Sequence, residues 1–160
     1  SANFRWSKTW KSHKIIIKKE SLSVFSELFI QKFIPPEEIR QSILSIKELY
    51  KDKHIKAIFQ PHLYSRTRDF YQEFADALSL LDDVVILDIY PARELPIPGV
   101  SSELIYNNLK PGIQRQMCHK EDIPALVENS SFDVLVTLGA GDIEDYATCI
   151  QEIVKNKVWR

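Results

Sequence analysis

Residues 55–68 read I-K-A-I-F-Q-P-H-L-Y-S-R-T-R, and this stretch decides the fold. Its first five residues form an apolar run of strand length, which stops at a proline. A histidine, a tyrosine, a serine and two arginines follow, ahead of an amphipathic helix that the spacing of apolar residues predicts over about 68–81. In an open α/β sheet, ligands bind just beyond the carboxyl end of a strand, beside the start of the next helix. We therefore interpret this turn as an anion-binding site.

Segments of helix and strand length alternate on either side of this stretch. A helix is predicted to open at 35–38, where two prolines and two glutamates suit a helix start. Ile39, Ile43, Ile46 and Leu49 follow at helical spacing. The other expected elements are strands at 55–59, 84–87, 113–118 and 134–138, and helices at 68–81, 102–109, 123–128 and 142–156. This alternation predicts an α/β fold with a mostly parallel sheet, covered by helices on both faces.

The first 34 residues are harder to assign. Residues 15–17 and 24–34 are compatible with strands, and antiparallel pairing at an edge of the sheet is one interpretation. We therefore divide the chain into an uncertain segment, 1–34, and one domain, 35–160. A chain of this length buries a core without disulfide or metal staples.

Composition excludes several classes of protein. The net charge is −1, which indicates neither a nucleic-acid nor an anionic membrane partner. Cys118 and Cys149 lie far apart and lack the spacing of a zinc site, which favours a reducing, cytoplasmic location. We find no membrane-span pattern, no metal-ligand cluster and no phosphate-binding G-x-x-x-x-G-K-[ST] loop.

The turn after residue 60 supplies the first candidate site residues. The Arg66 guanidinium is suited to hold a carboxylate or phosphate through two parallel hydrogen bonds, and His62 is placed to donate to the same anion. Tyr64 lies between them and is grouped with them. The alternative is that Arg66 and Arg68 only pair with acidic residues on the helix surface, as most exposed charges do.

Residues 139–142, G-A-G-D, supply a second candidate segment directly after a buried strand. Gly139 and Gly141 allow a tight turn and a close approach to a ligand or another loop. Asp142 is either a helix N-cap or a ligand-binding residue. In a parallel sheet this segment meets the ends of three other strands, at 60–68, 88–91 and 118–119. Residue pattern alone therefore predicts an α/β domain with an anion-binding edge.

Four motifs, in order, resemble one known family. They are F-Q-P-H-L-Y-S-R-T-R-D at 59–69, L-D-I-Y-P-A-R-E at 87–94, P-I-P-G-V-S-S-E at 96–103 and T-L-G-A-G-D-I at 137–143. Together they resemble the C-terminal domain of the Mur ligase family, in the form found in the alanine-adding UDP-N-acetylmuramate–L-alanine ligases. The resemblance covers roughly residues 36–156. The F-Q-P-H-x-Y-[ST]-R form is characteristic of the alanine-adding enzymes.

The resemblance implies a Rossmann-like domain of a cytoplasmic enzyme of peptidoglycan synthesis that requires ATP and magnesium. In that family an acyl phosphate forms on UDP-N-acetylmuramate and is attacked by the amine of L-alanine. His62 and Arg66, with Tyr64 beside them, would then lie on the L-alanine side of the active site. The loop of Gly139, Gly141 and Asp142 would form a wall of the cleft. The partners implied are the UDP-binding and central ATPase domains of the same enzyme.

Two departures from the family qualify this expectation. The family's P-loop has no counterpart in these 160 residues, so we expect no catalytic residue and no activity in this chain alone, whether it is a fragment or a stand-alone relative. The family's D-D-Y-A-H-H-P run corresponds to I-Q-K-F-I-P-P at 30–36, which lacks the tyrosine and histidine that contact substrate. A non-catalytic binding module derived from such a domain is therefore the alternative. An independent Rossmann-type oxidoreductase is a third and weaker interpretation.

Overall fold

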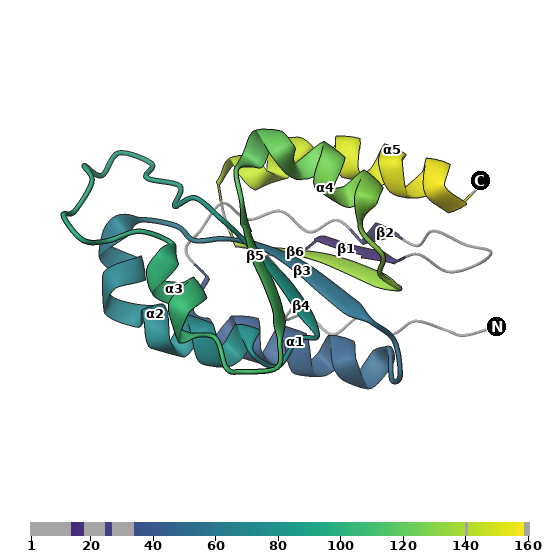
Figure 1. Cartoon of the computed structure of the whole chain (residues 1–160), viewed down its shortest axis with the longest axis horizontal. Helices are drawn as coiled ribbons and strands as arrows, with labels where there is room; N and C mark the ends of the chain where they lie inside the picture. The colour runs from purple at the N-terminus through teal and green to yellow at the C-terminus, as the bar shows by residue number, and fades with distance from the viewer. Residues whose placement is uncertain (1–13, 18–24, 27–33, 140, 159–160) are drawn as a thin grey trace.

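The protein is an α/β domain built on one six-stranded sheet (Figure 1). The structure, a computed structural model, describes residues 14–17, 25–26, 34–139 and 141–158. The strands are β1 (Lys14–Ile17), β2 (Phe25–Ser26), β3 (Ile55–Gln60), β4 (Asp83–Leu87), β5 (Gln114–Cys118) and β6 (Val134–Gly139). The helices are α1 (Pro36–Leu49), α2 (Tyr64–Leu78), α3 (Glu103–Asn108), α4 (Ile123–Asn129) and α5 (Ala147–Val158), with 3-10 turns η1 (Lys120–Asp122) and η2 (Asp142–Tyr146).

The sheet has the strand order β2-β1-β6-β3-β4-β5. Strands β6, β3, β4 and β5 are parallel neighbours, whereas β1 runs antiparallel to both β6 and β2. The mostly parallel α/β fold predicted from the sequence is confirmed. Residues 15–17 lie in β1, and Phe25–Ser26 form β2; most of the remaining 24–34 segment lies outside the described residues.

Successive residues of a strand point to opposite faces of the sheet. Because the central strands are apolar on both faces, helices cover both. Helices α1, α2 and α3 lie on one face, and α4 and α5 lie on the other (Figure 1). The first face packs on alternate strand residues such as Ala57, Val84 and Val136. The second packs on the residues between them, such as Ile58 and Leu135. Strands β3, β4 and β6 are buried on both faces, whereas β5 is mostly exposed. Because these four strands run parallel, their carboxyl ends meet at one edge of the sheet.

Both expected boundaries of the second helix are wrong. Helix α2 spans Tyr64–Leu78 rather than 68–81. The chain turns within residues 61–63, and the Thr67 N–H already bonds the Leu63 carbonyl at 3.1 Å. Leu81 is buried but follows the helix, in a tightened turn where its N–H bonds the Leu78 carbonyl.

The closing helix also starts later than expected, because residues 142–146 form the 3-10 turn η2 before α5 begins at Ala147. On α1, Ile39, Ile43 and Ile46 are fully buried as predicted. Leu49 is 54% exposed, so it does not belong to the buried face. It is the last residue of the helix.

Candidate functional site

The turn after β3 is held by the loop that follows β4. The Tyr90 N–H donates to the Pro61 carbonyl at 2.8 Å, and the Leu63 N–H donates to the Tyr90 carbonyl at 2.9 Å. These two bonds form a short parallel bridge between His62 and Tyr90. Leu63 has a φ of +69°, a backbone conformation that residues other than glycine rarely adopt. The turn is therefore fixed by its neighbour rather than by its own sequence.

The His62 ring packs against the Tyr90 ring. The two rings are stacked, with centroids 5.7 Å apart and planes inclined by 14°. Nδ1 of His62 is buried and has no hydrogen-bond partner among the described residues. Burial lowers the pKa of His62, although the nearby Glu94 carboxylate acts in the opposite direction. His62 is therefore biased toward its neutral form.

Glu94 occupies the start of α2, where the sequence predicted an external anion. One carboxylate oxygen accepts from the Ser65 N–H at 3.0 Å, and the other accepts from the Ser65 hydroxyl. These bonds lower the pKa of Glu94, and the amide of Tyr64 adds to the effect. The helix N-terminus is thus already neutralised by a carboxylate of the chain itself. An anion bound nearby would have to be held by side chains.

The tyrosine, serine and arginines predicted to precede the helix lie instead in its first two turns. Arg66 is exposed, and its guanidinium carbon lies 6.0 Å from the centre of the Phe70 ring. Tyr64 is partly exposed at the first position of the helix. Arg68 pairs with Asp69 at 2.8 Å on the surface, so the alternative of ordinary surface pairing is confirmed for this arginine.

The loop that begins at Gly139 packs tightly against both β3 and Tyr90. Gly139 has a φ of +109°, and a Cβ there would lie 2.1 Å from the Gln60 carbonyl oxygen. Gly141 has a φ of +123°, and a Cβ there would lie 2.5 Å from the Tyr90 ring. The predicted close approach is therefore to other parts of the chain. Both glycines are required by the way these segments meet.

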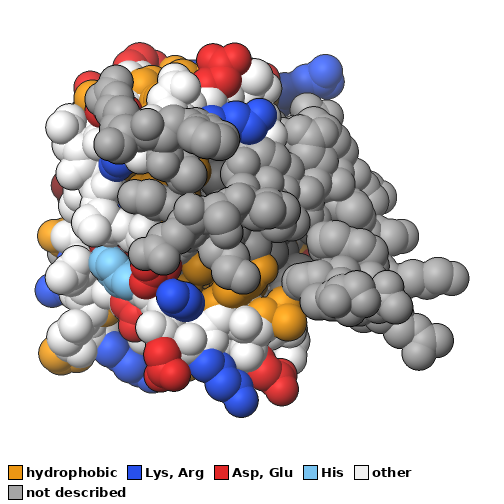
Figure 2. Space-filling model, turned by 90° about the vertical axis from the view of Figure 1, so that its right-hand side faces the viewer, with side chains coloured by type: hydrophobic (Ala, Val, Ile, Leu, Met, Phe, Trp, Pro, Cys, Tyr) orange, Lys and Arg blue, Asp and Glu red, His pale blue; other side chains and the backbone are white. Residues whose placement is uncertain are grey.

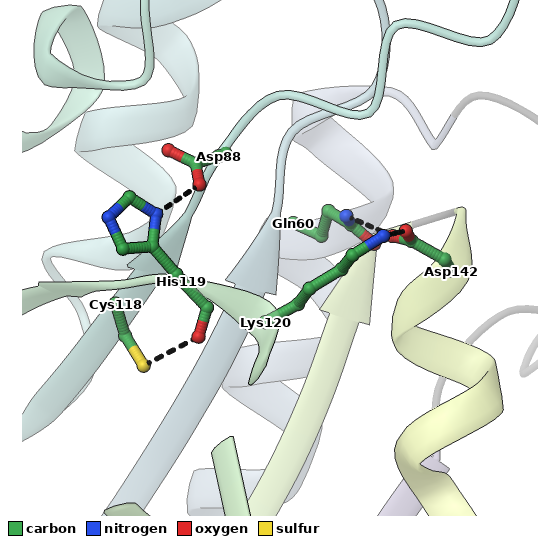
Figure 3. A network of polar contacts seen from close by, with 6 residues as sticks. All are labelled: Gln60, Asp88, Cys118, His119, Lys120 and Asp142. Atoms are coloured by element: carbon green, nitrogen blue, oxygen red, sulfur yellow. Dashed lines mark hydrogen bonds and ion pairs between the residues drawn. The ribbon is translucent and has the colours of Figure 1, made fainter. Parts of the chain in front are cut away.

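Asp142 joins three strand ends through side-chain bonds (Figure 3). The buried Gln60 amide donates to its carboxylate at 2.6 Å and accepts from the Ile143 N–H at 2.9 Å. Lys120 donates to the other carboxylate oxygen. Burial acts to raise the pKa of Asp142, but the bonds from Lys120 and Gln60 outweigh it and lower the pKa. Asp142 begins the 3-10 turn η2, and its carboxylate is engaged in this network.

A second polar pair lies beside this network. His119 Nδ1 and an Asp88 carboxylate oxygen are 2.6 Å apart, and both side chains are mostly exposed (Figure 3). This bond raises the pKa of His119. Both residues also line a pocket of about 400 Å³, together with Met117 and Leu126. Because Asp88 already balances a protonated His119, this pair adds no net positive charge for an anion.

The four strand ends expected at one edge do meet there, but sequence reasoning missed several residues that organise them. Gln60, Tyr90 and Glu94 lie inside the quoted motifs and Lys120 follows the strand end at 118–119, but none of the four had a predicted role. The sequence signal that could have found them is position, because each lies at the end of a predicted strand or in the loop that follows one. On the described part of the face in Figure 2, acidic and basic side chains lie interspersed, in keeping with the net charge of −1.

Comparisons with known proteins agree with this architecture. The UDP-N-acetylmuramate–L-alanine ligase of Phocaeicola vulgatus is 58% identical over 122 residues, which are 76% of this chain and 27% of that protein. The ligase of the same name from Porphyromonas gingivalis is 52% identical over 109 residues, 68% of this chain and 24% of that protein. The crystal structure of the UDP-N-acetylmuramate-alanine ligase MurC of Thermotoga maritima matches with a TM-score of 0.54 and 26% identity, covering 84% of this chain and 26% of that one. No protein-family model matches the chain.

The fold and the site define a Rossmann-like α/β domain with a polar site at the carboxyl ends of its strands. By sequence, the chain is homologous to one part of the UDP-N-acetylmuramate–L-alanine ligases, and the resemblance predicted from its four motifs is confirmed. It spans about a quarter of the length of these relatives. None of the helices in the described residues is both long and apolar enough to cross a membrane.

Proposed function

We propose that this chain is the C-terminal domain of a cytoplasmic UDP-N-acetylmuramate–L-alanine ligase of peptidoglycan synthesis, with residues 35–160 as the domain and 1–34 as an additional segment. The complete enzyme would use ATP and magnesium, bound through its central ATPase domain, and would take UDP-N-acetylmuramate through its UDP-binding domain. The observation that carries the proposal is the 58% identity to a protein of that name over 122 residues. The chain alone would catalyse no ligation.

His62 and Arg66 are the residues that we assign to L-alanine. His62 lies two residues before α2 and Arg66 in its first turn, beside a helix end that Glu94 already neutralises. A carboxylate ligand would therefore be held by the Arg66 guanidinium and a His62 N–H, with Tyr64 beside them. Holding alanine in this way orients its amine for attack, which is the main contribution of such a domain to catalysis. Gly139, Gly141 and Asp142 would form the cleft wall.

A chimera tests the proposal. The aligned 122-residue portion of the Phocaeicola vulgatus ligase is replaced by the corresponding residues of this chain, and ADP release is measured with UDP-N-acetylmuramate, L-alanine and ATP. We expect alanine-dependent ligation by the chimera and none by the 160-residue chain alone. A folded chimera that binds ATP and produces no amide would contradict the proposal. That outcome would favour the non-catalytic module, which the I-Q-K-F-I-P-P run at 30–36 suggests.

In the active chimera, Arg66→Ala is expected to raise the KM for L-alanine by about 10- to 100-fold, the worth of a charge-assisted hydrogen bond to a carboxylate. The KM for ATP should change little. Arg68→Ala is the matched control, because Arg68 lies on the same helix and pairs with Asp69 on the surface. Equal alanine dependence in the two variants would remove Arg66 from the site.

A further inference from the structure

Tyr90 touches two separate segments of the site, the turn at 61–63 and the loop after β6. Its backbone bonds Pro61 and Leu63 on either side of His62. Its ring stacks on the His62 imidazole and also fills the space in which a side chain at Gly141 would lie. The position of the imidazole is therefore set by Tyr90, and Tyr90 is in turn confined by the loop after β6.

This arrangement distinguishes the two nitrogens of His62. Nδ1 is buried without a hydrogen-bond partner among the described residues, whereas the side chain as a whole keeps part of its surface exposed. A proton on Nδ1 would bury an N–H donor that none of the described residues accepts, which is rarer in proteins than a buried, unpartnered acceptor. The proton of the neutral ring is then placed on Nε2, toward the exposed edge of the ring.

We propose that Tyr90 is a positioning residue that holds His62 as the neutral Nε2–H tautomer, so that this N–H is the donor offered to an acceptor oxygen of the ligand. The identification of that ligand as the carboxylate of L-alanine rests on the proposed function. The tautomer and its dependence on Tyr90 do not. Burial of the ring disfavours the charged form of His62, and the Glu94 carboxylate acts in the opposite direction.

The tautomer is measured directly by two-bond ¹H–¹⁵N correlation NMR on the 160-residue chain labelled at histidine. His62→Gln assigns the signals, because the chain has three other histidines. We expect the Nε2–H pattern for His62 at neutral pH. A predominant Nδ1–H pattern, or a doubly protonated ring at neutral pH, would overturn the proposal. The tautomer itself is read from the unaltered chain, and a variant serves only to assign the His62 signal.

Two variants separate positioning from packing. Tyr90→Phe keeps the ring and should retain the Nε2–H tautomer and the titration midpoint of His62. Tyr90→Leu removes the stacked ring, exposes Nδ1 to water and should raise the His62 midpoint toward that of an ordinary histidine, with both tautomers present. An unchanged tautomer and midpoint in a folded Tyr90→Leu chain would overturn the role of Tyr90.

The chimera then tests the ligand. Tyr90→Leu is expected to raise the KM for L-alanine up to about tenfold, the worth of one hydrogen bond, with kcat much less affected. Tyr90→Phe should restore the parent value. If the NMR results are as expected and the alanine dependence is unchanged, then His62 does not bind alanine, and the failure lies in the proposed function.

Discussion

Gly139→Ala is expected to destabilise the protein by about 3–5 kcal/mol. The added Cβ would lie 2.1 Å from the carbonyl oxygen of Gln60, and backbone atoms at the end of a central strand have little room to move away. The φ of +109° adds strain, because residues other than glycine pay about 1–3 kcal/mol in such conformations. Overpacking contributes a similar amount. The loss is a large share of the 5–15 kcal/mol that typically stabilises a domain.

Urea unfolding of the 160-residue chain measures this effect. Gly99→Ala is the matched control, since Gly99 also has a positive φ, of +76°, and a Cβ there would meet nothing within 4 Å. We expect the control to lose only the conformational part, about 1–2 kcal/mol. Equal losses in the two variants would show that the contact between Gly139 and Gln60 carries no energy of its own.

Lys56→Met is expected to cost about 3–5 kcal/mol, the usual loss when one partner of a buried ion pair is removed. Lys56 Nζ lies 2.7 Å from an Asp83 carboxylate oxygen, and the two side chains are only 6% and 9% exposed. They face each other in the parallel register of β3 and β4. The substitution leaves the Asp83 carboxylate buried in the sheet without a counter-charge.

The double variant Lys56→Met with Asp83→Leu distinguishes this cause from lost packing. With both charges removed, stability should return to within about 1–2 kcal/mol of the parent, because an apolar pair of similar volume needs no counter-charge. A surface control is Asp76→Asn, which breaks the exposed pair with Lys110 and should cost less than about 1 kcal/mol. A double variant as unstable as Lys56→Met would contradict the electrostatic explanation.

The α/β fold was predictable because its central strands are continuous apolar runs. Residues 84–87 and 134–138 have no polar interruption apart from Thr137, and only a sheet covered on both faces buries such runs. The start of α2 was not predictable from periodicity. Tyr64, Ser65 and Arg66 are polar or partly exposed, and the helix begins there because Tyr90 fixes the backbone on both sides of His62. Tyr90 lies at least 27 residues further along the chain than the residues it bonds.

The edge at which the strand ends meet was predictable, whereas the contacts formed there were predicted only in part. The convergence of strand ends follows from parallel topology and was expected. No sequence pattern indicated that the anion at the helix start would be Glu94, because a glutamate in a long loop can face in any direction. Only the closure of that loop onto Ser65 determines its role. The functional roles of His62, Arg66, Tyr64, Gly139, Gly141 and Asp142 stay predictions.

The bridge between His62 and Tyr90 has a consequence for protein engineering. A designer who transplanted residues 59–69 into another α/β scaffold would carry over the histidine and both arginines but not their geometry. Leu63 would lose the bond that sustains its unusual backbone conformation, and His62 would lose the ring against which it rests. A functional graft would need residues 87–94 and the 139–143 loop as well, so the smallest portable unit of this site is a set of three strand ends.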